Sequence, residues 1–266
     1  MKKLYLWEKG RVPYFKPEYN QPEPSLKPFL VDNGKKNGCV IVCPGGAYFT
    51  KSFHEGDPVC EKINSFGVSA FTLDYRVSPY QYPAITEDVL RAVRYVRYHA
   101  DELGIDPDKI AVLGFSAGGH LAASALCGFD YGREDGDETD KVSSRPDAVI
   151  LSYAVITLGK YTHADTRNNL IKGLPDEAEL ERRFSGELAV KKDTPPCFIW
   201  HTQNDDAVPV QNSLQLYNAL CEKKIPAELH IFPFGPHGLG LAETVPNVAQ
   251  WSSLLGNWLK LTGFVK

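Results

Sequence analysis

The stretch Gly114-Phe115-Ser116-Ala117-Gly118 has the form G-x-S-x-G, and it decides the fold prediction. An apolar run at residues 109–113 precedes it, and a helix-forming stretch at residues 120–126 follows it. Between a strand and a helix, a serine flanked by small residues is typical of a sharply turned backbone that holds the serine oxygen above the sheet. A glycine-rich turn that only packs tightly is the alternative interpretation. The strand–helix context favours Ser116 as a nucleophile.

Apolar runs and helical patterns alternate on both sides of this motif. Residues 39–43, 68–73, 149–151 and 198–200 are short, nearly continuous apolar runs that are typical of buried strands. Residues 83–103 form the clearest helix, because Val89, Val93 and Val96 fall on one stripe and Gly104 ends the pattern. Such alternation predicts an α/β protein with a mostly parallel central sheet and helices on both faces.

The length of 266 residues suits one domain that spans residues 1–266. The first 37 residues are rich in proline, so we expect short strands and loops at the edge of the sheet, with residues 1–7 as the first edge strand. Residues 154–193 interrupt the strand–helix rhythm. We expect them to form a small lid-like insertion over a site.

The composition argues against several classes of function. A formal net charge of -4 disfavours nucleic acid as a partner. No apolar run approaches the roughly 20 residues that cross a bilayer, and the apolar stretch in residues 1–7 is too short for a signal peptide. We therefore expect a cytoplasmic protein whose six cysteines are reduced thiols buried as small hydrophobes. Cys39 and Cys43 share one short strand without a second ligand pair, so we expect no metal and no other cofactor.

A serine hydroxyl becomes a good nucleophile only when a base takes its proton. Three histidines lie in the last third of the chain. His201 ends a strand and precedes every candidate acid, whereas His230 lies in the middle of a strand. His237 lies in a loop just after a strand, so it is the predicted base. Two neighbouring carboxylates, Asp205 and Asp206, compete as the acid that orients the base.

A serine that cleaves esters also needs donors for the oxyanion of the tetrahedral intermediate. The first predicted donor is the backbone N–H of Ala117, directly after the nucleophile. The second comes from the turn Pro44-Gly45-Gly46-Ala47-Tyr48, which follows an early strand. Its glycines leave the N–H of Gly46 or Ala47 free to point into the site.

With these residues in view, the chain resembles the bacterial acetylesterase branch of the α/β-hydrolases, a group of acetyl-xylan esterase-like, sugar-ester hydrolase and xylanase-B-related proteins. The resemblance implies the α/β-hydrolase fold and hydrolysis of short acyl esters, often acetyl groups on sugars, without a metal. Many hydrolases of this fold carry D-x-x-V-P in the loop that supplies the acid, which is residues 202–209 here (the acid loop). This spacing selects Asp205 over Asp206. The matching motifs run from about residue 40 to residue 259 and comprise residues 44–48, 73–77, 114–122, 200–205 and 237–241.

The sequence therefore predicts a serine carboxylic ester hydrolase, a carboxylesterase or acetylesterase that works through an acyl-enzyme. Acetylated sugars or xylo-oligosaccharides are its candidate substrates, and Tyr48, Tyr161 and His163 are candidates to contact them at the entrance. Two alternatives stay open. One is a peptidase of the same fold, and the other is a non-catalytic protein that holds a small ligand in the pocket. The sequence does not identify the quaternary state, for which a homodimer is one alternative.

Overall fold

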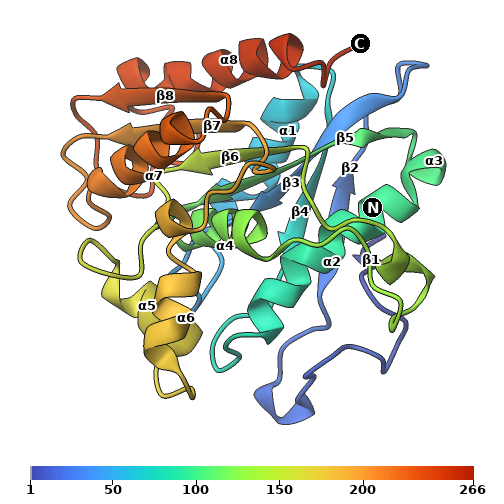
Figure 1. The fold of residues 1–266 in the computed structure, drawn as a ribbon. Coiled ribbons are helices and arrows are strands. Elements are labelled where there is room, and N and C mark those ends of the chain that lie inside the picture. Colours follow the sequence, from blue (N-terminus) through green and yellow to red (C-terminus); the bar gives the residue numbers. More distant parts are fainter. Residues whose placement is uncertain (1) are drawn as a thin grey trace.

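Eight strands form one sheet in the computed structural model, which describes residues 2–266 (Figure 1). The strand order is β1-β2-β4-β3-β5-β6-β7-β8, and the antiparallel neighbours are β1 with β2 and β2 with β4. All other neighbours are parallel, so the prediction of a mostly parallel sheet is confirmed. The strands are β1 (Leu4–Tyr5), β2 (Ser25–Phe29), β3 (Asn37–Cys43), β4 (Ser69–Asp74), β5 (Ile105–Phe115), β6 (Ala148–Ser152), β7 (Cys197–Thr202) and β8 (Ala227–Phe232).

Helices cover both faces of this sheet, as predicted. One apolar core lies between the sheet and helices α1 and α8, and a second lies between the sheet and α2, α4 and α7. Figure 1 shows α8 along the top of the molecule, with α2 and α4 below the strands. The helices are α1 (Asp57–Asn64), α2 (Ala84–Tyr98), α3 (Ala100–Leu103), α4 (Ser116–Gly128), α5 (Ala164–Ile171), α6 (Glu177–Arg183), α7 (Gln211–Glu222) and α8 (Pro246–Leu261), with short 3-10 turns η1 (Pro17–Tyr19), η2 (Phe53–Glu55), η3 (Glu138–Lys141) and η4 (Gly186–Leu188).

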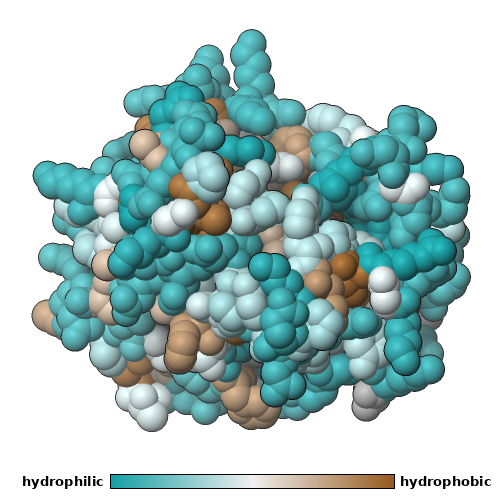
Figure 2. Space-filling view, turned by 90° about the horizontal axis from the view of Figure 1, so that it is seen from below, coloured by the Kyte–Doolittle hydropathy of each residue, from teal (hydrophilic) through white to brown (hydrophobic). Residues whose placement is uncertain are grey.

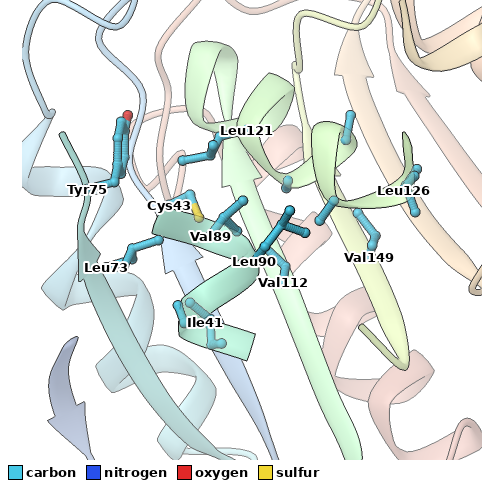
Figure 3. Packing of buried hydrophobic residues seen from close by; sticks show 14 of the residues in the cluster. Ile41, Cys43, Leu73, Tyr75, Val89, Leu90, Val112, Leu121, Leu126 and Val149 are labelled. Carbon is cyan, nitrogen blue, oxygen red and sulfur yellow. The ribbon is translucent and has the colours of Figure 1, made fainter. Parts of the chain in front are cut away.

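Apolar side chains of α2 and α4 pack directly on the strands that carry the site. Figure 3 shows Val89 and Leu90 of α2 near Ile41 and Val112, which lie on β3 and β5. Val89, Ile41 and Val112 are fully buried. Because the core is closely packed, it fixes the position of each strand end relative to the ends of the neighbouring strands.

Several predicted boundaries shift in the structure. The helix predicted over residues 83–103 is divided into α2 and α3 at His99, while Gly104 ends α3 in a left-handed conformation (φ 67°). The edge strand predicted for residues 1–7 is the two-residue β1, and Met1 lies outside the described residues. The expectation that the cysteines are buried is wrong for Cys221, which is exposed on α7. In residues 2–266, no helix is long and apolar enough to cross a membrane.

Residues 154–193 form a small helical segment that contains α5, α6 and η4. In Figure 1, α5 and α6 lie side by side at the lower left. Figure 2, viewed from below, shows a face that is mostly hydrophilic, with small and separate hydrophobic patches. The inner side of the segment packs into the core through Val155, Ile156, Leu170 and Phe184, all at most 3% exposed. These contacts anchor the segment to the sheet.

The sharp turn from β5 into α4 at Ser116, called the elbow below, depends on glycines. A Cβ on Gly114 would overlap the Gly118 carbonyl group, and a Cβ on Gly118 would overlap the carbonyl oxygens of Cys43 and Pro44. Ser116 itself has a φ of 52°, a left-handed conformation that is uncommon for residues other than glycine. The absence of side chains at these glycines lets the start of α4 approach the end of β3.

Replacing one of these glycines should therefore destabilise the protein. We expect Gly118→Ala to lower the free energy of unfolding by about 3 kcal/mol, because backbone atoms must move to admit the methyl group. Gly128→Ala, in the same helix, is the matched control, since its Cβ would meet only Leu90 at 3.9 Å. It should leave stability unchanged or raise it by up to about 1 kcal/mol. Urea unfolding of both variants checks this, and equal effects would contradict it.

Candidate active site

Three predicted side chains, from three separate segments, form one hydrogen-bonded row. Ser116 begins α4, Asp205 follows β7 and His237 lies in the loop after β8. The Ser116 Oγ lies 2.8 Å from His237 Nε2, and His237 Nδ1 lies 2.7 Å from Asp205 Oδ2. Ser116 and Asp205 are each 8% exposed. The parallel strands place all three at the same edge of the sheet, because each follows the carboxyl end of a strand.

The partners decide which imidazole nitrogen of His237 carries the proton. The Asp205 carboxylate only accepts hydrogen bonds, so Nδ1 donates to it and Nε2 accepts from the Ser116 hydroxyl. Burial raises the pKa of Asp205, but hydrogen bonds from His201, His237 and the Val208 N–H outweigh burial and hold that pKa well below its usual range. Asp205 is therefore ionised at neutral pH, and His237 can take the serine proton.

The acid loop explains why Asp205 and not Asp206 reaches the base. Asp205 Oδ1 accepts the N–H groups of Ala207 and Val208 at 3.0 and 2.8 Å, which turns the other oxygen toward His237. Asp206 is exposed. The D-x-x-V spacing thus corresponds to a side-chain-to-backbone turn that fixes the orientation of the carboxylate.

His201, which the sequence excludes as the base, supports the acid. It is fully buried, and its Nε2 donates to the Val208 carbonyl oxygen at 2.9 Å while lying 3.4 Å from Asp205 Oδ2. Its Nδ1 is hydrogen bonded to Ser213 Oγ at 2.8 Å. The sequence signal for this role is its position at the end of β7, four residues before the acid.

The turn after β3 presents two backbone N–H groups to the site. Gly46 and Ala47 have positive φ values of 130° and 56°, and within residues 2–266 neither N–H has a hydrogen-bond partner. Both residues line the cavity that contains Ser116. Ala117 is the second residue of α4, where an N–H has no acceptor within its own helix. The structure thus places Gly46 and Ala47 in the lining of the cavity at Ser116, and Ala117 next to Ser116 at the start of α4.

One cavity of about 590 Å³ opens at this row. Its remaining lining comes from the turn after β3, from η2, from α5 and the residue before it, and from the loop after β8 that carries His237, called the histidine loop below. These residues are Phe49, Thr50, Ser52, His54, Glu55, His163, Asp165, Asn169 and Gly238, beside Gly46, Ala47, Ser116 and His237.

Of the three predicted entrance residues, His163 alone lines this cavity. The prediction for Tyr48 is wrong, because its φ of 57° turns the side chain into the core, where it is fully buried. Tyr161 lines a different hollow, beside Lys160 and Glu181. Phe49, the next residue after Tyr48, is 71% exposed and takes the position predicted for Tyr48 at the cavity. The sequence does not show which of two adjacent aromatic residues faces outward.

Buried Tyr48 joins the turn to α4 and to the segment 154–193. Its hydroxyl is hydrogen bonded to His120 Nδ1 at 2.8 Å, and His120 Nε2 is bonded to the Phe184 carbonyl oxygen at 2.9 Å. Because the carbonyl only accepts, Nε2 carries the proton and Nδ1 accepts from Tyr48. Burial lowers the pKa of His120 to about 4, so this histidine is neutral at pH 7.

The histidine loop is held by hydrogen bonds from several elements. Gly240 donates its N–H to the Tyr153 hydroxyl at 2.8 Å and accepts the Trp251 indole N–H at 3.1 Å. His54 Nε2 donates to the Gly238 carbonyl oxygen at 2.9 Å. Tyr153 also forms a T-shaped contact with the His237 ring, with centroids 5.0 Å apart. None of these anchors was predicted, because they lie far apart in the sequence and carry no motif.

Comparison with known families identifies the chain. The BD-FAE family model matches residues 29–220, which include β3, the turn after it, the elbow serine and the acid loop. The chain belongs to the BD-FAE family. Its strand order and two-sided layering are those of the α/β-hydrolase fold, as the resemblance implied.

Known relatives of this BD-FAE chain agree with that resemblance. It is 43% identical over 223 residues to endo-1,4-beta-xylanase B of Butyrivibrio fibrisolvens, covering 82% of this chain and 35% of the relative. It is 31% identical over 237 residues to acetylxylan esterase of Xylanibacter ruminicola, covering 87% and 47%. The chain thus spans between a third and a half of the length of these curated relatives.

A solved structure matches the whole BD-FAE chain. The acetyl ester-xyloside bifunctional hydrolase from Caldicellulosiruptor lactoaceticus superposes with a TM-score of 0.96 at 44% sequence identity, and covers 100% of this chain and 97% of its own. The predicted membership in the acetyl-xylan esterase-like and xylanase-B-related branch is confirmed.

The neutral His120 should make the stability of the BD-FAE chain depend on pH. Its folded pKa of about 4 lies below the unfolded value of about 6.5, so the unfolded chain binds more protons between these values. The contribution of His120 is therefore complete above about pH 6.5 and is lost as the pH falls toward 4, by about 3 kcal/mol in total. We expect His120→Gln to remove this part of the pH dependence in urea unfolding at pH 7 and pH 4. Identical pH dependence in the variant and the wild type would contradict the assignment.

Proposed function

We propose that this BD-FAE domain is a serine carboxylic ester hydrolase that cleaves short-chain acyl esters. The observation that carries the proposal is the row Ser116–His237–Asp205, which opens into a cavity beside unpaired backbone N–H groups. A nucleophile, a base, an orienting acid and oxyanion donors are the groups that acyl transfer requires. The xylanase B, acetylxylan esterase and acetyl ester hydrolase relatives support the same chemistry.

Catalysis proceeds through an acyl-enzyme. The Ser116 Oγ attacks the carbonyl carbon of the ester while its proton passes to His237 Nε2, and Asp205 stabilises the imidazolium. The N–H groups of Ala117 and of Gly46 or Ala47 donate to the oxyanion. The C–O bond to the alcohol then breaks, and the alcohol leaves with the proton from His237. Water, deprotonated by His237, attacks the carbonyl carbon of the acyl-enzyme. The bond from this carbon to Ser116 Oγ then breaks, His237 returns the proton to Oγ, and the acid leaves.

The polar lining of the cavity supports an alcohol portion rich in hydroxyl groups. Asp165 and Asn169 line it from α5, and His54 and His163 line it from the two flanking turns. The exposed ring of Phe49 supplies an apolar surface of the kind that stacks on a sugar face. Acetylated sugars or xylo-oligosaccharides are therefore the proposed substrates, and the acetylxylan esterase relative supports this choice.

The proposal extends to the organisation of the chain. Residues 1–266 act as one catalytic domain, and residues 154–193 form its lid-like cap through α5 at the cavity. The cap is a fixed one, because Asn169 donates to the Ala47 carbonyl oxygen at 2.8 Å and Phe184 is bonded to His120. The six free thiols support a reducing compartment such as the cytoplasm.

A binding protein that retains the fold is the contrasting function. It would hold a small ester without turnover, and the complete set of chemical groups at the site disfavours it. A peptidase would also use Ser116, and it would have to accommodate a peptide amide in the same cavity. Assays on esters and on peptide amides separate the three functions. An esterase cleaves esters, a peptidase cleaves peptide amides, and a binding protein cleaves neither.

Removal of the nucleophile should abolish hydrolysis. We expect Ser116→Ala to reduce kcat on p-nitrophenyl acetate by about 10⁴- to 10⁶-fold, as in other serine hydrolases. The matched control is Ser124→Ala in the same helix, whose hydroxyl donates to the Leu121 carbonyl oxygen, and it should retain the wild-type rate. Rates on acetate through octanoate esters should fall with acyl length. Folded wild-type protein without activity on any ester would refute the esterase proposal and favour the binding role.

Contacts at the cavity rim should affect sugar esters more than simple ones. We expect Phe49→Ala and Asp165→Ala to raise KM for acetylated xylo-oligosaccharides by about 5- to 50-fold, which corresponds to about 1–2 kcal/mol. Their KM for p-nitrophenyl acetate should change by less than about twofold. Tyr131→Ala, an equally exposed aromatic that does not line the cavity, is the control. If all three variants keep the wild-type preference between the two substrates, the sugar assignment is wrong.

A further inference from the structure

A buried carboxylate lies beside the nucleophile without belonging to the hydrogen-bonded row. Glu55, the last residue of η2, is 2% exposed. Its Oε2 lies 2.7 Å from the point where a Cβ on Gly45 would stand, and the Ser116 Cβ lies 3.0 Å from the same point. Glu55 therefore approaches the nucleophile from the side of the turn after β3.

Both oxygens of Glu55 are bonded to protein donors. Oε2 accepts the Gly45 N–H at 2.7 Å, and Oε1 accepts the Tyr153 hydroxyl at 2.6 Å. In residues 2–266, the one basic side chain within 4.0 Å of this carboxylate is the imidazole of His54, whose Nε2 lies 3.9 Å from Oε1 and which is 57% exposed. Burying a carboxylate with so little opposite charge costs free energy. Such a cost is typical of groups that serve a site rather than stability.

Tyr153 continues the chain of hydrogen bonds to the other side of the site. Its hydroxyl has a single proton, which it donates to Glu55, and it accepts the Gly240 N–H at 2.8 Å. Its ring forms T-shaped contacts with the His237 and Trp200 rings, with centroid distances of 5.0 Å in both cases. Tyr153 is 1% exposed, so water does not compete for these bonds.

We propose that Glu55 and Tyr153 are positioning residues that clamp the turn after β3 and the histidine loop into one rigid arrangement around Ser116. The clamp runs from the Gly45 N–H through Glu55 and Tyr153 to the Gly240 N–H, and so joins segments nearly 200 residues apart. This inference rests on the proposed hydrolase function, because the clamped groups are the oxyanion donors and the base.

The geometry explains how each end of the clamp acts. The hydrogen bond at Gly45 fixes the peptide plane that precedes Gly46 and Ala47, whose free N–H groups line the cavity. The bond at Gly240 holds the loop three residues after His237, while the Tyr153 ring limits the tilt of the imidazole. A shift of about 1 Å in such groups can cost about 10²-fold in rate.

Three variants separate a clamp from a charge effect. Tyr153→Phe keeps the ring and removes the hydroxyl, and Glu55→Leu removes both acceptors. Glu55→Gln keeps one of the two links, since its carbonyl oxygen can accept from the Gly45 N–H or from the Tyr153 hydroxyl, while its NH2 group only donates. Tyr80→Phe is the control: this residue is 3% exposed and its hydroxyl binds the Lys16 backbone, outside the cavity.

For p-nitrophenyl acetate, we expect Tyr153→Phe and Glu55→Leu to lower kcat by about 10- to 100-fold, with KM within about threefold of wild type. Glu55→Gln should have a kcat between those of Glu55→Leu and the wild type, because it keeps one of the two links, and Tyr80→Phe should match the wild type. The double variant Glu55→Leu/Tyr153→Phe should be about as slow as the slower single variant, because the two residues act as a unit. A Tyr153→Phe variant with the wild-type kcat beside a slow Glu55→Leu variant would show that only the charge of Glu55 matters, and would overturn the clamp.

Hydrogen exchange provides a readout that does not need hydrolysis. Amide exchange at Gly45 and Gly240, whose N–H groups the clamp binds, should accelerate together in Tyr153→Phe and Glu55→Leu by at least about tenfold, and by less in Glu55→Gln. An inactive wild type with this exchange pattern would refute the esterase proposal and leave the clamp as a physical coupling. An active wild type whose Tyr153→Phe variant keeps both kcat and exchange rates would refute the clamp alone.

Discussion

The close approach of α4 to the end of β3 is the constraint on which the site depends. Gly118 meets the Cys43 and Pro44 carbonyls, and this contact brings the serine at the start of the helix beside the turn that carries the free N–H groups. Without it, nucleophile and oxyanion donors would lie on separate elements with no common reference. The parallel sheet then adds the acid and the base, because their strands end at the same edge.

Around this contact, acceptor groups decide which ring nitrogen carries the proton in three histidines. A carboxylate fixes the proton of His237 on Nδ1, whereas backbone carbonyls fix the protons of His201 and His120 on Nε2. His120 serves structure, since burial keeps it neutral between Tyr48 and Phe184. The same residue type therefore lies beside Asp205, joins the segment 154–193 to the turn after β3, or is hydrogen bonded to Ser116, according to what lies opposite each nitrogen.

Positive φ angles can be predicted from the sequence where they fall on glycine, but not where they fall on other residues. The glycines of the elbow and of the early turn are visible signals, and they allowed the nucleophile and its donors to be predicted. Ala47 and Tyr48 adopt left-handed angles without being glycine, and this twist buries Tyr48 and exposes Phe49. Nothing local in the sequence predicts that reversal, because the twist is maintained by tertiary contacts such as the Tyr48–His120 bond.

The sequence by itself determined the alternation that makes a parallel sheet and the elbow with Ser116, and it selected His237 and Asp205 as the proposed base and acid, because each depends on local spacing along the chain. Tertiary structure alone decided that Glu55, Tyr153 and His201 lie behind these groups, and that α5 rather than Tyr48 or Tyr161 lines the cavity. The reason is physical: these contacts join residues that are distant in sequence, and their geometry exists only once the sheet has brought the strand ends together.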